Sequence, residues 1–146
     1  MRISTRSRYG TRLMINLAEK YNKGYSLLKD IAREECISEK YLSQIVIPLR
    51  VAGLLTGSRG ASGGYILTKS PSDITVKEIV ETLEGDLCII DCTVDEKSCE
   101  RSSNCVSKGI WDDLSLRINE YLSTITLEDL VKTKKQQEAE YIEYVI

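Results

Sequence analysis

The stretch 26–68 constrains the fold most, because two short helical patterns and a glycine-rich hairpin pattern follow one another with almost no linker. Ser26 is the expected N-cap of the first helix, and the turn 35–37 ends that helix. Ser38 is expected to cap the second helix, and Gly53 ends it. A short helix, a tight turn and a longer capped helix predict a helix-turn-helix.

The second helix of this motif has an apolar face and a polar face. Its apolar residues recur at helical spacing and are expected to be buried: Leu42, Ile45, Val46 and Leu49. Its N-terminal polar residues are expected to point outward: Glu39, Lys40, Ser43 and Gln44. Serine and glutamine side chains can hydrogen-bond to base edges in a major groove. Cys36, in the turn before this helix, is expected to be a buried packing residue.

Two strands, 54–59 and 64–68, are expected after the second helix, with a hairpin tip at 60–63. A hairpin in this position is a wing. Arg59 would project from the tip, and a narrow minor groove attracts such an arginine. The alternative for a glycine-rich hairpin is a plain turn. The stretch lacks the Gly-Lys-Ser/Thr of a phosphate-binding P-loop.

An amphipathic first helix is expected at about residues 6–22, because apolar residues recur there every four positions. Its start carries Arg2, Arg6, Arg8 and Arg12. A helix N-terminus disfavours cations, so these residues are not placed for helix stability. They suit an external anion such as phosphate; the alternative is a solubilising surface.

The net charge of −2 conceals an uneven distribution. Residues 1–70 contain twelve Lys and Arg against five Asp and Glu, whereas residues 71–146 contain eight against seventeen. A basic half joined to an acidic half suggests that one end faces a polyanion and the other serves a different role. Uneven surface charge arising by chance is the alternative.

The second half begins near Pro71 and contains three further helical patterns. The capping box Thr75–Glu78 opens a helix to about residue 84. A long helix at about 105–123 has an apolar stripe too wide for a monomer to cover, which predicts a homodimer. A short final helix is expected after Thr126, followed by a charged and then aromatic tail. The expected division is 1–70, 71–135 and 136–146.

Four of the five cysteines lie in the polar segment 88–105, between two helices. Six residues separate Cys92 from Cys99 and five separate Cys99 from Cys105, in a segment with little apolar character, so burial does not explain these cysteines. Thiolates are ligands for iron–sulfur clusters and zinc. Structural zinc usually uses more closely spaced pairs. A cluster, zinc, a redox disulfide and no function are the alternatives that the residues leave open.

Histidine is absent from the chain, which excludes Ser-His-Asp and Cys-His nucleophiles and His-based zinc sites. No pattern of an enzyme active site is present, so we expect a non-enzymatic protein. No run of eighteen apolar residues predicts a membrane helix, and the N-terminus lacks the apolar run of a signal peptide. A cytoplasmic location is expected.

The order of these elements resembles the Rrf2 family of bacterial transcription regulators, over about residues 1–132. The resemblance lies in the N-terminal segment 1–10, the helix-turn-helix residues 31–44, the wing Arg59–Tyr65 and the three-cysteine loop. It implies a mainly α fold with a small β-wing: a winged helix-turn-helix with a long dimerisation helix, acting as a homodimeric repressor that binds double-stranded DNA. The DNA contacts expected are Arg2, Arg8, Tyr9, Ser38, Glu39, Lys40, Tyr41, Ser43, Gln44, Arg59 and Gly60.

Within this family the chain is similar to the iron–sulfur-cluster regulators, which implies cluster ligands at Cys92, Cys99 and Cys105. A 2Fe–2S cluster is favoured over a 4Fe–4S cluster. Relatives take a fourth ligand from a histidine at the position of Lys108, or from an acidic residue near Arg8, and neither is present. Cys88, Asp91, Glu100 and an external thiol or water are the candidates for that ligand.

The C-terminal segment Tyr141–Ile146 resembles the tail of Rrf2-type cysteine-metabolism regulators, which are controlled by docking of O-acetylserine sulfhydrylase. That resemblance implies partner contacts at Tyr144 and Ile146. A terminal carboxylate is a group that backbone donors can bind in a pocket. Control by a partner enzyme, or by a thiol switch, is therefore the alternative function.

Overall fold

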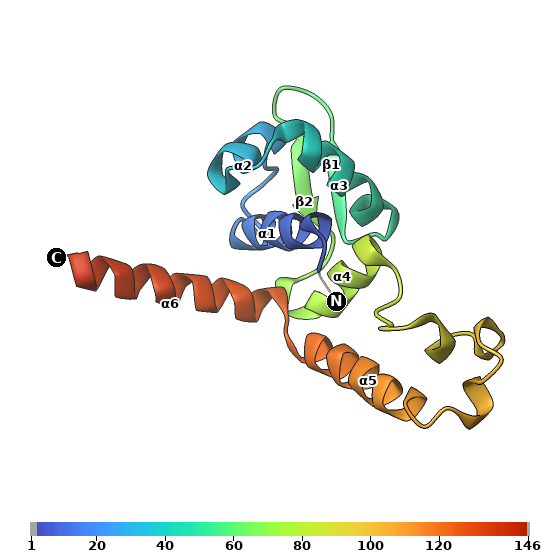
Figure 1. Ribbon diagram of the computed structural model, residues 1–146. Helices are drawn as coiled ribbons and strands as arrows, with labels where there is room; N and C mark the ends of the chain where they lie inside the picture. Colours follow the sequence, from blue (N-terminus) through green and yellow to red (C-terminus); the bar gives the residue numbers. More distant parts are fainter. Residues whose placement is uncertain (1–2, 146) are drawn as a thin grey trace.

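The computed structural model describes residues 3–145 and shows a winged helix-turn-helix body from which two long helices extend (Figure 1). The helices of the body are α1 (Thr5–Glu19), α2 (Leu28–Glu35), α3 (Glu39–Val51) and α4 (Val76–Glu84). The extending helices are α5 (Lys108–Thr124) and α6 (Leu127–Val145). This architecture confirms the fold class expected from the sequence.

The wing is a two-stranded antiparallel sheet of β1 (Leu55–Ser58) and β2 (Gly64–Leu67). Leu55 pairs with Leu67 at its base, and Ser58 pairs with Gly64 near its tip. Ser26 extends the wing, because its backbone exchanges two hydrogen bonds with Tyr65. The expectation that Ser26 caps α2 was therefore wrong: Leu27 precedes that helix, and its side chain makes no capping bond.

Gly64 is needed for this arrangement. Its φ of +133° is a backbone conformation that L side chains rarely adopt, and a Cβ there would overlap the Ser26 carbonyl. The glycine at the start of β2 therefore lets the segment before α2 lie directly against the wing.

The core of the body forms where α1, α3 and α4 meet, together with the base of the wing. Leu13, Leu42, Leu49, Ile74 and Ile79 are fully buried there. Local capping sets the helix starts, as expected: Ser38 accepts from the Tyr41 amide, and Thr75 and Glu78 form a reciprocal capping box. These caps fix the direction in which α3 and α4 leave their loops.

Cys36 ends α2 in the left-handed conformation, with φ of +53°, and its side chain is exposed. The expectation of a buried packing residue was wrong, because this conformation turns the chain sharply between α2 and α3 while Ile37 fills the core position instead.

The final helix is also longer than expected. Thr126 and Asp129 cap its start as anticipated, but α6 continues over 19 residues to Val145 rather than ending after a few turns. The segment 132–140 is rich in Lys, Gln, Glu and Ala and contains no glycine or proline, so helix propensity favours continuation. No described helix has the length and apolar character needed to cross a membrane.

Candidate nucleic-acid interface and cysteine loop

The N-terminal half of α3 presents polar side chains to solvent. Glu39, Lys40, Ser43 and Gln44 are all exposed. The Ser43 hydroxyl donates to the Lys40 carbonyl at 2.6 Å, which orients its oxygen along the helix. Because α3 is anchored by its buried face, this end can enter a groove without disturbing the core.

Tyr9 and Tyr41 connect this helix to α1. The two rings meet edge to face, with centroids 5.7 Å apart and planes at 84°. Both are half-buried, and the Arg12 guanidinium lies over the Tyr9 ring. These two residues, which the sequence placed among the DNA contacts, thus also fix the position of α3 relative to α1.

The tip of the wing is exposed and contains Arg59 and Gly60. Gly60 has φ of +110°, and a Cβ on Gly63 would overlap the backbone of residues 58–60. The tip can therefore make its tight turn only with glycine at these positions. The Arg59 side chain and the protein backbone of the tip are available to contact DNA phosphates or a minor groove.

The arginines at the start of α1 divide into two groups. Arg6 and Arg8 are exposed. Arg12 instead bonds to Glu35 of α2, through its Nε to the carboxylate at 3.2 Å and through its terminal nitrogen to the backbone carbonyl. Arg12 is therefore a structural link between α1 and α2. Arg2 lies outside the described residues.

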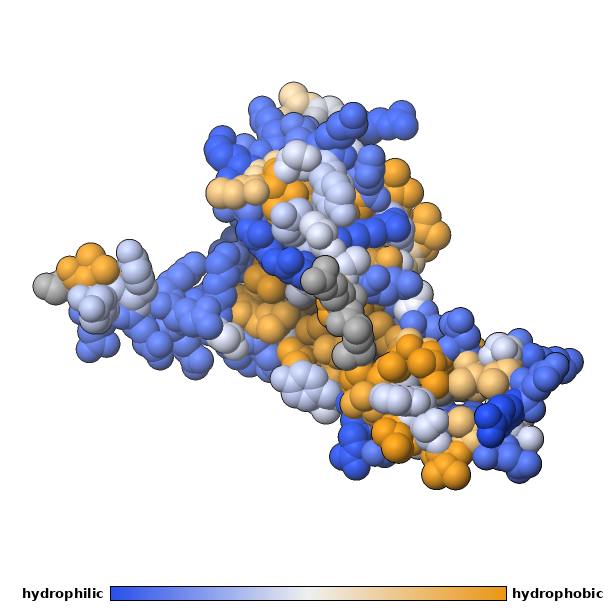
Figure 2. All heavy atoms as spheres, in the orientation of Figure 1, coloured by the Kyte–Doolittle hydropathy of each residue, from blue (hydrophilic) through white to orange (hydrophobic). Residues whose placement is uncertain are grey.

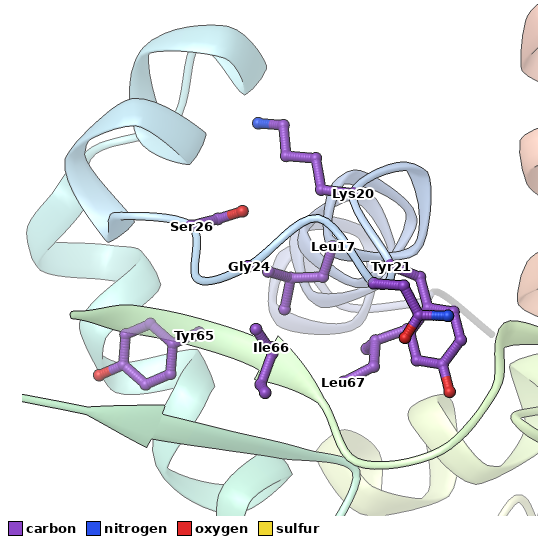
Figure 3. Close-up of a pocket in the computed structure, with 9 residues that line it drawn as sticks. Leu17, Lys20, Tyr21, Gly24, Ser26, Tyr65, Ile66 and Leu67 are labelled. Carbon is purple, nitrogen blue, oxygen red and sulfur yellow. The ribbon is translucent and has the colours of Figure 1, made fainter. Parts of the chain in front are cut away.

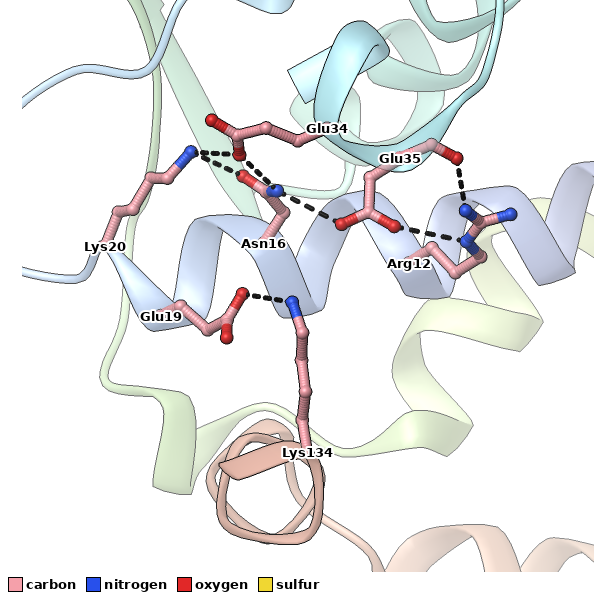
Figure 4. Close-up of polar contacts among 7 residues, drawn as sticks. All are labelled: Arg12, Asn16, Glu19, Lys20, Glu34, Glu35 and Lys134. Carbon is pink, nitrogen blue, oxygen red and sulfur yellow. Dashed lines mark hydrogen bonds and ion pairs between the residues drawn. The ribbon is translucent and has the colours of Figure 1, made fainter. Parts of the chain in front are cut away.

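A polar network joins α1 to the helix-turn-helix and to α6 (Figure 4). Asn16 is 2% exposed, and its amide donates to Glu34 at 2.9 Å and to Glu35 at 3.1 Å. Lys20 donates to both Asn16 and Glu34. The hydrogen bond from Lys20, followed by that from Asn16, lowers the pKa of Glu34. Sequence reasoning missed Asn16; its only signal was an amide on an otherwise apolar helix face.

Lys134 connects α6 to the opposite side of α1. Its ammonium donates to the Glu19 carboxylate at 2.7 Å (Figure 4). Burial is the largest single contribution to the pKa of Lys134 and lowers it. The hydrogen bond and charge of Glu19, with the charges of Glu35 and Glu138, together exceed that contribution and raise the pKa of Lys134. The contact joins residues 115 positions apart, so no local pattern in the sequence indicated it.

A small cavity lies between the end of α1 and the wing (Figure 3). Leu17, Tyr21, Tyr65 and Leu67 are among the residues that line it, and its volume is about 90 Å³. Cofactor pockets are typically about 300–1,000 Å³. This cavity is therefore too small for an organic cofactor.

The cysteine loop runs from Gly85 to Ser107 and contains three short 3₁₀ turns, Asp91–Thr93, Glu96–Ser98 and Ser102–Asn104. Cys92, Cys99 and Cys105 are partly exposed, Cys88 is exposed, and all are free thiols. A hydrogen bond with Ser107, 3.2 Å from the sulfur, is the main cause that lowers the pKa of Cys105, followed by the Lys108 amide.

These thiols suit an iron–sulfur cluster by their chemistry, since clusters are ligated by thiolates. Their described placement does not bring them together: among the side chains that the structure describes, no three from Cys, Asp or Glu lie close enough to hold a metal ion. Asp91 and Glu100, the acidic candidates for a fourth ligand, are exposed on the same loop. The donor set is present, and binding would require the loop to close around the cluster.

Helix α5 exposes much of its apolar side. Figure 2 shows apolar residues gathered at this end of the molecule. Ile110 is 61% exposed and Tyr121 66%, and Ser115 is the only buried residue that α5 contributes within the described chain. A groove of about 440 Å³ between α5 and the end of α4 includes Leu87, Ile118 and Leu122. Such a surface is typical of an interface.

Comparisons with known proteins place the chain in a family. A profile of the Rrf2 family, described as an iron-dependent transcriptional regulator, matches residues 3–133. The transcriptional regulator CymR of Bacillus subtilis is 39% identical over 145 residues, which is 99% of this chain and all of that protein. The chain belongs to the Rrf2 family.

Other Rrf2 proteins match over most of their length. The regulator IscR of Photorhabdus laumondii is 35% identical, covering 92% of this chain and 82% of that protein. Among solved structures, CymR, the global cysteine regulator of B. subtilis, superposes with a TM-score of 0.76 over 91% of this chain and 98% of that one. T. potens IscR gives the same TM-score at 36% identity, covering 94% and 90%.

The protein is therefore a DNA-binding transcription regulator of the Rrf2 family, a family of regulators rather than enzymes. The residues of α3 and of the wing that were expected to contact DNA lie on the surface of one winged helix. Ile146, like Arg2, lies outside the described residues. Tyr144 lies at the end of α6 and is 91% exposed.

Proposed function

We propose that this Rrf2 protein is a homodimeric repressor whose operator binding is controlled by an iron–sulfur cluster held by Cys92, Cys99 and Cys105. The observation that carries this proposal is the set of three free, partly exposed thiols in a polar loop between α4 and α5. The relatives named IscR and the iron-dependent family description agree with it.

On the DNA side, the proposal assigns base reading to Ser43 and Gln44 and minor-groove contact to Arg59 and Gly60. The remaining expected contacts would bind the phosphate backbone or orient the reading helix: Arg2, Arg8, Tyr9, Ser38, Glu39, Lys40 and Tyr41. Arg2 lies outside the described residues. The exposure of Arg8, Ser38, Glu39 and Lys40 on one winged helix, with the two half-buried tyrosines between α1 and α3, supports this assignment.

Dimerisation would occur through the exposed apolar side of α5. A helix of 17 residues is about 26 Å long. A symmetric dimer along this length would present two reading helices to a two-fold-symmetric operator.

In the loop, Cys92, Cys99 and Cys105 would ligate the cluster, which supplies redox-sensitive iron–thiolate bonds when bound. The candidate fourth ligands are Cys88, Asp91, Glu100 and an external thiol or water. Holding the three thiols together would draw residues 92–105 into one position and fix the end of α4 relative to the start of α5. The DNA affinity would then depend on the arrangement of the two reading heads.

DNA-binding titrations under anaerobic conditions test the proposal. The probe is a duplex selected by the protein from a random-sequence library, and binding is followed by fluorescence anisotropy. We expect wild-type affinity to change when iron is removed by a chelator, and Cys99→Ala to lose this response. Cys36→Ala, which removes an exposed thiol outside the loop, should retain it. A response that survives in Cys92→Ala, Cys99→Ala and Cys105→Ala would overturn the proposal.

The wing assignment has a separate test. Arg59→Ala should weaken binding to the selected duplex by about 1–3 kcal/mol. Lys132→Ala, which removes a charge from an ion pair with Glu128 on α6, serves as the matched control. Equal affinity of the Arg59→Ala variant and wild type would exclude a wing contact.

Control by a partner enzyme is the second candidate function. It is favoured by the match to CymR, which covers all of that protein, and by the aromatic end of α6. In this case Tyr144 and Ile146 would contact an O-acetylserine sulfhydrylase. Removing residues 141–146 should then abolish binding of the sulfhydrylase in biolayer interferometry. A lack of binding to the full-length protein would exclude this function.

A thiol switch is the remaining version of this alternative, with a disulfide between two loop cysteines controlling DNA binding in place of a cluster. Oxidised and reduced forms of a metal-free sample would then differ in operator affinity, and Cys36→Ala would keep the difference. Equal affinities of the two forms would exclude the switch.

A further inference from the structure

The last turn of α4 binds the N-terminus of α1. The Ser4 amide donates to Glu84 Oε1 at 2.9 Å, across 80 positions of sequence. Ser4 is the N-cap of α1, and its hydroxyl accepts from the Ser7 amide. The Glu84 carboxylate at the end of α4 therefore extends the N-terminal cap of α1.

This contact supplies a charge that α1 lacks. The first turn of α1 contains no acidic residue and instead carries Arg6 and Arg8, which a helix N-terminus disfavours. Glu84 places an anion at that terminus from another helix. Hydrogen bonding from Ser4 is the largest cause that lowers the pKa of Glu84, and the charge of Arg6 makes a smaller contribution, so the group is ionised at neutral pH.

Close packing next to the contact also joins the two helices. A Cβ on Gly10 would overlap the Leu83 side chain, so α1 and α4 approach each other as closely as glycine permits. Leu83 is 6% exposed. This packing and the bond between Ser4 and Glu84 together place the start of α1 against the end of α4.

The same turn is where the cysteine loop begins. Gly85, directly after Glu84, has φ of +89° and turns the chain away from α4. Figure 1 shows the start of α1 near α4, with the loop leaving from the end of α4. One residue therefore touches the arginine-bearing start of α1 and adjoins the loop that carries the thiols.

We propose that Glu84 is a positioning residue for DNA binding, which holds the N-terminal turn of α1 on the end of α4 and thereby links the DNA-contacting arginines to the cysteine loop. This inference rests on the proposed function, in that it takes Arg8 as a DNA contact and the loop as the sensor. Glu84 does not itself touch DNA in this account; its carboxylate acts through the Ser4 amide.

The first experiment uses metal-free protein, so that it does not depend on a cluster. Binding of Glu84→Ala and wild type is measured to the selected duplex and to a scrambled duplex of equal length. We expect the ratio of the two affinities to fall about fivefold in the variant, the size expected for loss of a helix cap. Glu84→Gln keeps an oxygen acceptor for the Ser4 amide and should retain most of the ratio.

Glu81→Ala is the matched control, because Glu81 lies on the same helix and its carboxylate forms an ion pair with Lys77 at the surface. If Glu84 acted only through its charge, its removal would strengthen binding to both duplexes equally and leave the ratio unchanged. An unchanged ratio, or an equal fall in Glu81→Ala, would overturn the inference. Thermal unfolding verifies that each variant is folded.

A second experiment tests the link to the loop. In protein that shows cluster absorbance, the ratio of operator affinities with and without iron should move toward one in Glu84→Ala, while the visible spectrum stays as in wild type. An unchanged affinity ratio would contradict the link. If wild type shows no cluster, the proposed cluster function fails, and the metal-free measurement still decides whether Glu84 positions α1.

Discussion

The winged-helix body and the α5 region use the same kind of amphipathic pattern for different purposes. Among the described residues, every buried apolar side chain except Leu127 lies between Leu13 and Leu83. Helix α5 buries only a serine and exposes large apolar residues such as Ile110 and Leu116. The body buries its apolar residues against itself, whereas α5 leaves its apolar residues uncovered within one protomer. An apolar stripe in a sequence therefore identifies a face but not its partner.

The largest effect should come from the body. Leu42→Ala removes a fully buried side chain from α3 and should reduce the free energy of unfolding by about 2–5 kcal/mol. Val51→Ala, on the same helix but 85% exposed, should change it by less than about 0.5 kcal/mol. Urea denaturation at several protein concentrations measures both. Similar losses for the two variants would show that α3 is not packed as described.

A charge placed on α5 should break the assembly rather than the fold. Ile110→Glu puts an unpaired carboxylate in the proposed interface, which costs about 3–5 kcal/mol and weakens the dimer more than about a hundredfold. Sedimentation velocity should show monomers with an unchanged far-ultraviolet circular dichroism spectrum. Val51→Glu adds the same charge to an exposed apolar position on the body and should leave the dimer intact. Dimers of Ile110→Glu would place the interface elsewhere.

Within the body, the polar network on α1 should contribute less than the core. Asn16→Ala leaves Glu34 and Glu35 without a buried donor and should cost about 1–3 kcal/mol in unfolding free energy. Lys20→Ala removes a partly exposed partner of Glu34 and of Asn16 and should cost less than about 1 kcal/mol. A smaller loss for Asn16→Ala than for Lys20→Ala in urea denaturation would show that the buried amide is not the centre of the network.

The smallest effect concerns pH. The pKa of Glu34 is lowered in the folded protein, so its contribution to stability is present above the unfolded value of 4.5 and is lost as the pH falls through the lower folded value. Glu34→Gln should therefore be less stable than wild type at neutral pH, and the two should converge in strong acid. Thermal unfolding between pH 7 and pH 3 tests this; a constant difference across that range would contradict it.

Local chemistry explains what the sequence could predict. The caps at Ser38 and Thr75 act within three residues, and the wing follows from its own glycines, so these elements were predicted correctly. Ser26 was misassigned because its actual partner, Tyr65, lies in a distant strand. Local sequence cannot distinguish a cap from such a bridge.

The candidate site was predictable in composition but not in arrangement. Polar residues at the start of α3 and glycines beside Arg59 predicted a DNA-facing surface, and these residues are exposed in the structure. The contacts Ser4–Glu84 and Glu19–Lys134 join residues 80 and 115 positions apart, which no periodicity reveals. The positions of the loop cysteines relative to one another depend on contacts between residues far apart in the sequence and on any group that the cysteines bind.

The most direct test of the central proposal is a visible absorption spectrum, with iron and sulfide analysis, of protein purified without oxygen. We expect broad sulfur-to-iron absorption with matching iron and sulfide in wild type and in Cys36→Ala, and loss of both in Cys92→Ala, Cys99→Ala and Cys105→Ala. Two iron and two sulfide ions per protomer would indicate a 2Fe–2S cluster, and four of each would indicate a 4Fe–4S cluster. A colourless, iron-free wild-type protein after reconstitution would contradict the cluster account.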